Sequence, residues 1–154
     1  METLLASVSL ENGGEDFIFT GVNVHIRDGT GDTDGVTNGL GNLIVGYNED
    51  STGGEIRSSF AGLVAGYNNY ISGWYASVSG GSANTDSGDY SSVSGGFLNT
   101  ANGVYASVSG GSQNNAAGDD SSVSGGLAND ANGLYSSIYG GYNQTVTTTY
   151  GYGP

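Results

Sequence analysis

Oxygen-bearing side chains gather in a glycine-rich stretch near the start of the chain. Asp28, Asp32, Asp34 and Asn38 have the spacing of a calcium loop, which reads D-x-D-G-x-x-N from Asp32 onward. Carboxylate and amide oxygens are the ligands that Ca²⁺ prefers. The stretch lacks the closing glutamate of such loops, so a glycine-rich turn with solvated aspartates is the competing interpretation. Calcium is the one cofactor that the sequence suggests, and these four residues are its candidate ligands.

Catalytic motifs are not found elsewhere in the sequence. The chain has one histidine, His25, and no cysteine, which argues against a zinc site and a cysteine nucleophile. No serine stands in a G-x-S-x-G elbow, and no glycine pattern matches a phosphate-binding loop. Polysaccharide-cleaving β-helices carry clustered acids or bases, whereas residues 58–118 offer only the acids Asp86 and Asp89. We therefore predict no catalytic residues and a protein that is not an enzyme.

Composition narrows the choice of partner and compartment. The formal net charge is −13, with fifteen acidic residues, two arginines and no lysine. Such a chain is repelled by nucleic acid and by anionic membranes. The start METLLASVSL lacks a basic segment and a long apolar run, so it does not read as a signal peptide, and no segment is long enough to cross a membrane. The absence of lysine and cysteine favours an extracellular, cell-surface or virion-fibre protein.

A block of fifteen residues recurs along the second half of the chain, starting at Trp74, Asp89, Val104, Asp119 and Leu134. The period fits one coil of a parallel β-solenoid, in which each repeat stacks on the next. One column holds the β-branched residues Val78, Val93, Val108, Val123 and Ile138. Because side chains alternate along a strand, this column and Ala76 face the core, while Tyr75, Ser77 and Ser79 face outward. We expect an all-β solenoid with seven or eight coils.

A second set of columns follows in each block. The first is an asparagine column, expected to form a hydrogen-bonded ladder of stacked amides: Asn69, Asn84, Asn99, Asn114 and Asn129, ending at Gln144. The second is a glycine column, expected at corners with positive φ: Gly73, Gly88, Gly103, Gly118 and Gly133.

The pattern extends toward the N-terminus in weaker form. Leu63 precedes Val78 by one period, residues 43–48 resemble residues 63–68, and Val22, Val24 and Ile26 alternate as an earlier strand. Residues 6–9 repeat the sequence of residues 76–79, as if the chain began inside a coil. We divide the chain into irregular coils with loop insertions (1–57), regular repeats (58–145) and a C-terminal tail or final strand (146–154).

The motif Gly96-x-x-Asn99-x-Ala101-x-Gly103-x-x-Ala106-Ser107-Val108 resembles the head repeats of trimeric autotransporter adhesins. The resemblance covers residues 58–145 well and residues 17–57 loosely. It implies a left-handed parallel β-roll, three chains packed side by side, and a surface that adheres to host matrix or to other cells. This chain differs in its period of fifteen instead of fourteen and in Ser-Gly-Gly where the family has Ala-Ile-Gly. Phage fibres and secreted bacterial proteins carry similar repeats.

The leading hypothesis is a structural and adhesive solenoid that assembles with itself as a homo-oligomer or filament and offers a surface to a cell-surface or carbohydrate ligand. Apolar residues expected on the outside are the interface candidates: Tyr75, Tyr90, Tyr105 and Tyr135 in one column, Ile44 and Val64 toward the N-terminus, and Tyr139 and Tyr142 near the C-terminus. Two alternatives remain: an ice- or surface-binding protein with a serine and tyrosine ladder, and a receptor-binding module of a phage fibre.

Overall fold

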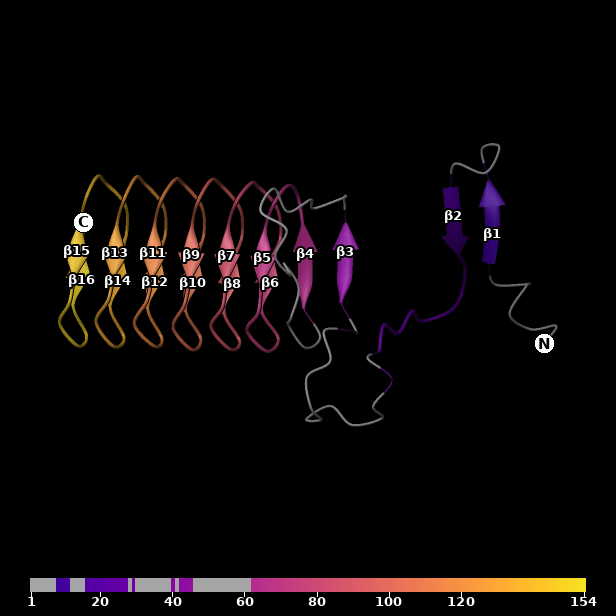
Figure 1. Cartoon of the computed structure of the whole chain (residues 1–154), viewed down its shortest axis with the longest axis horizontal. Coiled ribbons are helices and arrows are strands. Elements are labelled where there is room, and N and C mark those ends of the chain that lie inside the picture. Colours follow the sequence, from indigo (N-terminus) through magenta and orange to yellow (C-terminus); the bar gives the residue numbers. More distant parts are fainter. Residues whose placement is uncertain (1–7, 12–15, 28, 30–39, 41, 46–61) are drawn as a thin grey trace.

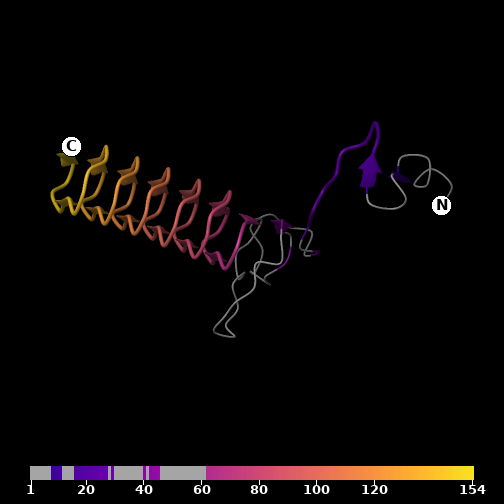
Figure 2. The same cartoon turned by 90° about the horizontal axis from the view of Figure 1, so that it is seen from above.

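The computed structural model describes residues 8–11, 16–27, 29, 40, 42–45 and 62–154. It confirms an all-β parallel solenoid with coils of about fifteen residues. The turns stack along one axis, as Figures 1 and 2 show. The described residues form about six turns, whereas we expected seven or eight for the whole chain. Within the described residues no helix occurs that is long and apolar enough to span a membrane.

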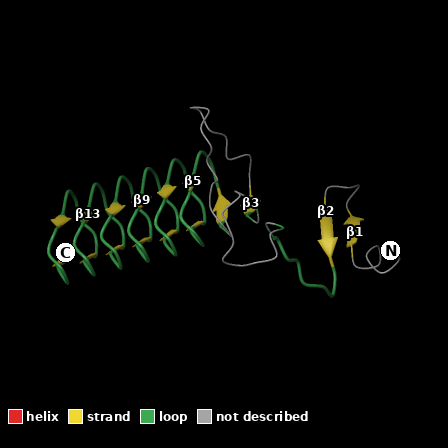
Figure 3. Ribbon diagram, turned by 60° about the horizontal axis from the view of Figure 1, so that its bottom comes forward, coloured by secondary structure: helices red, strands yellow, loops and turns green. Residues whose placement is uncertain are grey.

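Two parallel sheets form the solenoid, joined by turns that are longer than the strands themselves (Figure 3). The eight-stranded sheet contains β3 (Leu43–Val45), β4 (Leu63–Ala65), β6 (Ser77–Val78), β8 (Ser92–Val93), β10 (Ser107–Val108), β12 (Ser122–Val123), β14 (Ser137–Ile138) and β16 (Tyr152–Gly153). The six-stranded sheet contains β5 (Tyr70–Ile71), β7 (Thr85–Asp86), β9 (Thr100–Ala101), β11 (Asn115–Ala116), β13 (Asp130–Ala131) and β15 (Thr145–Val146).

Except in the pairs β3–β4 and β4–β6, each strand of the solenoid pairs with the strand one repeat away, so the period of the sequence sets the register of the sheets. Val108 pairs with Val93 on one side and with Val123 on the other. The buried core is this valine column facing the small side chains of the six-stranded sheet, such as Ala101 and Ala116. Inward valines and outward serines are therefore placed as expected, and residues 152–153 add a final strand to the stack.

The register shifts by one residue at the first regular turn. Val64, not Leu63, pairs with Val78, whereas Tyr67 pairs with Ser82 at the full period. The arc Ser77–Gly81 is thus one residue longer than the arc that begins at Leu63. The expectation that Val64 faces outward was wrong, because this shift places it in the core with no exposed surface. Ile44 pairs with Val64 and continues the same column at the end strand of the sheet, where it is still exposed.

The N-terminal segment departs from the coil pattern. Strands β1 (Val8–Glu11) and β2 (Asp16–Phe19) form an antiparallel hairpin with Val8 opposite Phe19, not the start of a coil. The turn signal Asn12-Gly13-Gly14 between two alternating runs favours such a hairpin. Residues 20–27 form no strand, and Val22, Val24 and Ile26 are all exposed, which corrects the strand expected there.

The glycine column has a different cause from the one expected. Gly118 does not have positive φ; a Cβ there would collide with the backbone carbonyl of Gly133 in the next turn. Positive φ occurs instead at another glycine column, for example at Gly111 (82°), and at non-glycine corners such as Tyr105 (58°). The glycine column that contains Gly118 is therefore required by the close stacking of the turns, and not by a positive φ angle at a corner.

Candidate functional site: the two edges of the solenoid

The turns that lead from the six-stranded to the eight-stranded sheet carry a tyrosine at most levels. We call this side the tyrosine edge; its corner column is Tyr75, Tyr90, Tyr105, Asp120, Tyr135 and Tyr150. The rings stack on one another, with centroids 5.1 Å apart for Tyr75–Tyr90 and Tyr90–Tyr105 and 5.0 Å apart for Tyr135–Tyr150. The expected outward column is present, although it lies at left-handed corners and not on strands. Tyr150 was missed, although it follows Tyr135 by one period.

The ring column is interrupted at one level. Asp120 keeps the corner conformation of its neighbours, with φ of 54°, and its N–H donates to the Val104 carbonyl at 2.8 Å. The backbone of the edge is therefore continuous, and only the side chain differs. Tyr105 and Tyr135 lie one level to either side of Asp120, and each stacks on its neighbour farther from Asp120.

A second column of the tyrosine edge alternates apolar and acidic residues. Trp74, Val104 and Leu134 are exposed, and Asp89 and Asp119 stand between them. The Asp89 carboxylate accepts the Trp74 N–H at 2.8 Å, and the Asp119 carboxylate accepts the Val104 N–H at 3.0 Å. The tyrosine edge is thus aromatic, apolar and acidic at once.

The opposite turns form an edge that we call the neutral edge. Its two columns hold no charged residue: Tyr67, Ser82, Phe97, Ser112, Leu127 and Tyr142 in the first, and Asn68, Ala83, Leu98, Gln113, Ala128 and Asn143 in the second. Large apolar side chains are exposed along it, from Tyr67 through Phe97, Leu98 and Leu127 to Tyr142. Of this edge, only Tyr142 was expected as an interface residue.

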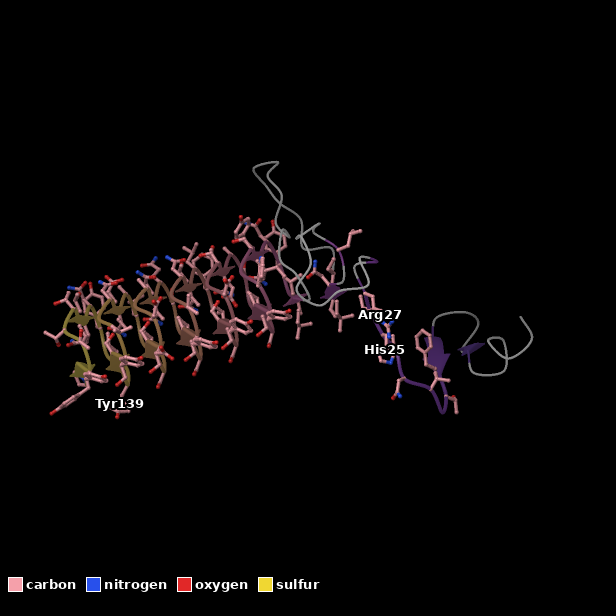
Figure 4. The ribbon with its side chains drawn as sticks, turned by 90° about the horizontal axis from the view of Figure 1, so that it is seen from below. His25, Arg27 and Tyr139 are labelled. Carbon is pink, nitrogen blue, oxygen red and sulfur yellow. The ribbon has the colours of Figure 1, made fainter. Side chains whose placement is uncertain are left out.

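The outer face of the eight-stranded sheet carries serine columns. Ser77, Ser92, Ser107, Ser122 and Ser137 pair in register, and Ser79, Ser94, Ser109 and Ser124 form an exposed column beside them. Tyr139 continues the second column and is 69% exposed (Figure 4). The serines that we expected to face outward therefore form a regular array of hydroxyl groups on this sheet face.

The asparagine ladder holds the turns together from inside. The Asn99 Oδ1 accepts the Asn114 backbone N–H at 3.0 Å, and the same bond recurs along the column. Asn99 Nδ2 donates to the carbonyls of Gly95 and Gly111, in its own turn and the next one. The ladder joins side-chain oxygens mainly to backbone N–H groups instead of joining amide to amide. Its asparagines are fully buried, so their role is structural.

Asp86 is a fully buried acid in the core of the solenoid. It occupies the column of Ala101 and Ala116, and it accepts hydrogen bonds from the Ser91 hydroxyl and from the Ser77 N–H, the latter at 3.0 Å. Burial raises the pKa of its carboxyl to about 7, while the two hydrogen bonds act in the opposite direction. With no exposed surface it offers no access to a substrate, although its pKa is in the range of a general acid or base.

The remaining candidates are placed as follows. The proposed calcium ligands Asp28, Asp32, Asp34 and Asn38 lie outside the described residues. In the described ranges no three histidine, aspartate or glutamate side chains gather as a metal site. His25 and Arg27 are exposed in the segment before the solenoid (Figure 4).

Comparisons with protein-family models, with curated proteins and with solved structures found no match to this chain.

Proposed function

We propose that the protein is a non-enzymatic structural solenoid. Copies of the chain associate through the neutral edge, and the other faces of the solenoid adhere to a surface. One observation carries the proposal: a row of exposed aromatic and aliphatic side chains runs along an edge without any charge. Exposed apolar rows of this kind mark interaction sites. The resemblance to adhesin head repeats supports an arrangement of three solenoids side by side, outside the cell or on a virion fibre.

Charge selects the neutral edge over the tyrosine edge for contact between copies. With a net charge of −13, two copies repel each other wherever their acids meet. The tyrosine edge brings Asp89, Asp119 and Asp120 into any such contact. The neutral edge brings none, so its apolar burial is opposed only by the long-range charge of the whole chain.

The chain itself supplies the test variant. Serine already occupies the first column of the neutral edge at Ser82 and Ser112, so the double substitution Phe97→Ser and Leu127→Ser is compatible with the fold. By analytical ultracentrifugation we expect the unmodified chain to form oligomers at micromolar concentration and the double variant to sediment as a monomer.

The matched control is Leu134→Thr on the tyrosine edge, where Thr149 occupies the same column one turn later. It should associate like the unmodified chain. A 15.5 kDa species for the unmodified chain at these concentrations would contradict the proposal, as would unchanged association of the double variant.

A second function, binding of ice or another ordered surface, is favoured by the serine columns alone. Strands about 4.8 Å apart and side chains two residues apart give a two-dimensional lattice of hydroxyls. Thermal hysteresis of a purified solution tests it directly. Ser109→Tyr would place in the middle of the array the side chain that Tyr139 has at its end, and it should abolish any hysteresis without changing the melt.

A further inference from the structure

We propose that the gap at Asp120 in the tyrosine column binds the guanidinium group of an arginine on a basic polypeptide partner. The site goes beyond the proposed self-association and does not depend on it, since it lies on the tyrosine edge. Its parts are two aromatic walls, Tyr105 and Tyr135, and one carboxylate between them.

The dimensions of the gap follow from the repeat. Neighbouring rings of the column stand 5.0–5.1 Å apart, and Tyr105 and Tyr135 belong to turns that are two levels apart. Two strand spacings separate these turns by about 10 Å. A planar group placed midway would lie about 5 Å from each ring centroid, within the ~6 Å reach of a cation–π contact. The missing ring therefore leaves room for one planar group.

The charge of the gap selects a cation. Asp120 is exposed at the level of the missing ring, and Asp119 precedes it with its carboxylate accepting the Val104 N–H. The described part of the solenoid, residues 62–154, contains no lysine or arginine that would compete for these acids. An arriving cation would meet a carboxylate at the base of the gap and the electron-rich face of a ring on each side.

Arginine fits this arrangement better than lysine does. Guanidinium is planar and weakly hydrated, stacks on aromatic faces, and can direct its N–H groups in the same plane toward a carboxylate. An ammonium group is compact and strongly hydrated, and it would lose more hydration between two rings. The partner is therefore a protein or peptide that presents an exposed arginine.

Saturation-transfer NMR on the full chain tests the site whatever the size of its assemblies. The probes are three capped pentapeptides, Gly-Gly-Arg-Gly-Gly and its lysine and citrulline counterparts. We expect transfer to the arginine side-chain protons, severalfold weaker binding of the lysine peptide and no binding of the citrulline peptide. Equal binding of the lysine and arginine peptides would overturn the proposal.

Three variants locate the binding. Asp120→Tyr completes the column with the residue that the other levels carry and should abolish binding with the fold intact, and Asp120→Asn should weaken it about fivefold. Asp130→Asn removes the same charge from the six-stranded sheet and should change the affinity by less than twofold. Binding that survives Asp120→Tyr, or that Asp130→Asn weakens as much as Asp120→Asn does, would overturn the assignment. Should Asp120→Tyr fail to fold, Asp120→Asn against Asp130→Asn decides it.

Discussion

Asp86 occupies the core column in which later turns have Ala101, Ala116, Ala131 and Val146, and its effect on the free energy of unfolding depends on pH. The pKa of its carboxyl is about 7 in the folded chain and near 3.8 in the unfolded one, so the folded state binds the proton more tightly. The stabilising effect of protonation is fully present below pH 3.8 and is lost as the pH rises through 7. Ionised Asp86 is thus a buried charge that only two hydrogen bonds compensate.

We predict that Asp86→Ala reverses its effect with pH. At pH 8.5 the variant should be more stable than the unmodified chain by a few kcal/mol, because it removes a buried carboxylate. At pH 3.5 it should be equal or slightly less stable, since Asp86 is then largely protonated in both the folded and the unfolded chain and the protonated acid keeps its bond to Ser91. Urea denaturation followed by circular dichroism at both pH values measures this. An equal effect at both would show that Asp86 does not titrate in this range.

Two buried serine hydroxyls without hydrogen-bond partners identify positions where a single substitution should raise stability. The Oγ atoms of Ser121 and Ser136 lack hydrogen-bond partners, whereas Ala76 and Ala106 fill the same column elsewhere. Ser121→Ala should therefore stabilise the fold by about 1 kcal/mol. Ser91→Ala is the contrasting variant, because the Ser91 hydroxyl donates to Asp86, and at pH 5 it should destabilise. Thermal melts of the two proteins should move in opposite directions; a lower melting temperature for Ser121→Ala would refute the argument.

At the scale of the element, close contact between the backbones of neighbouring turns, more than the φ angle, determines where the turns require glycine. Gly118→Ala should destabilise the solenoid severely, by several kcal/mol, because its Cβ would collide with the Gly133 carbonyl in the next turn. Gly125→Ala, in the next block, meets nothing within 4 Å and should be close to neutral. The urea midpoints of the Gly118→Ala and Gly125→Ala variants measure this difference. Similar midpoints would mean that the turns at Gly118 and Gly133 are not in close backbone contact.

The strands also show which parts of this fold could be predicted from the spacing of the repeats. Where the block repeats without change, spacing alone determines register, so the pairing of Val93 with Val108 and the inward valines followed from the columns. Spacing failed at Val64, where one arc is shorter by a residue, so that the residues of β4 pair one position away from the register of the repeat. It failed again at Val8, where identical letters in a different context form a hairpin. Left-handed corners at residues such as Tyr105 could not be predicted, because tyrosine has no preference for that conformation.

At the scale of the whole molecule, residues fifteen positions apart stack on one another, so a side chain that recurs in each repeat forms a row along the solenoid axis. Recurring apolar side chains form the exposed row of the neutral edge, and recurring serines form a row of hydroxyl groups. A single different residue, such as Asp120, interrupts the row of stacked tyrosine rings. Each turn contacts mainly its neighbours, so these lines can vary while the core columns stay constant. The solenoid is in this sense a frame that presents several surfaces of different chemistry.

Salt should act in opposite directions on the two edges. Association through the neutral edge works against the charge of −13 on each copy, so raising the salt from about 20 mM to about 300 mM shortens the Debye length and should strengthen it. Binding of the arginine peptide at Asp120 depends on attraction between opposite charges, so the same salt should weaken it. Sedimentation and saturation-transfer NMR at matched salt concentrations measure the two responses on one sample. Association that weakened with salt would mean that ion pairs join the copies, and the uncharged edge would then not be their interface.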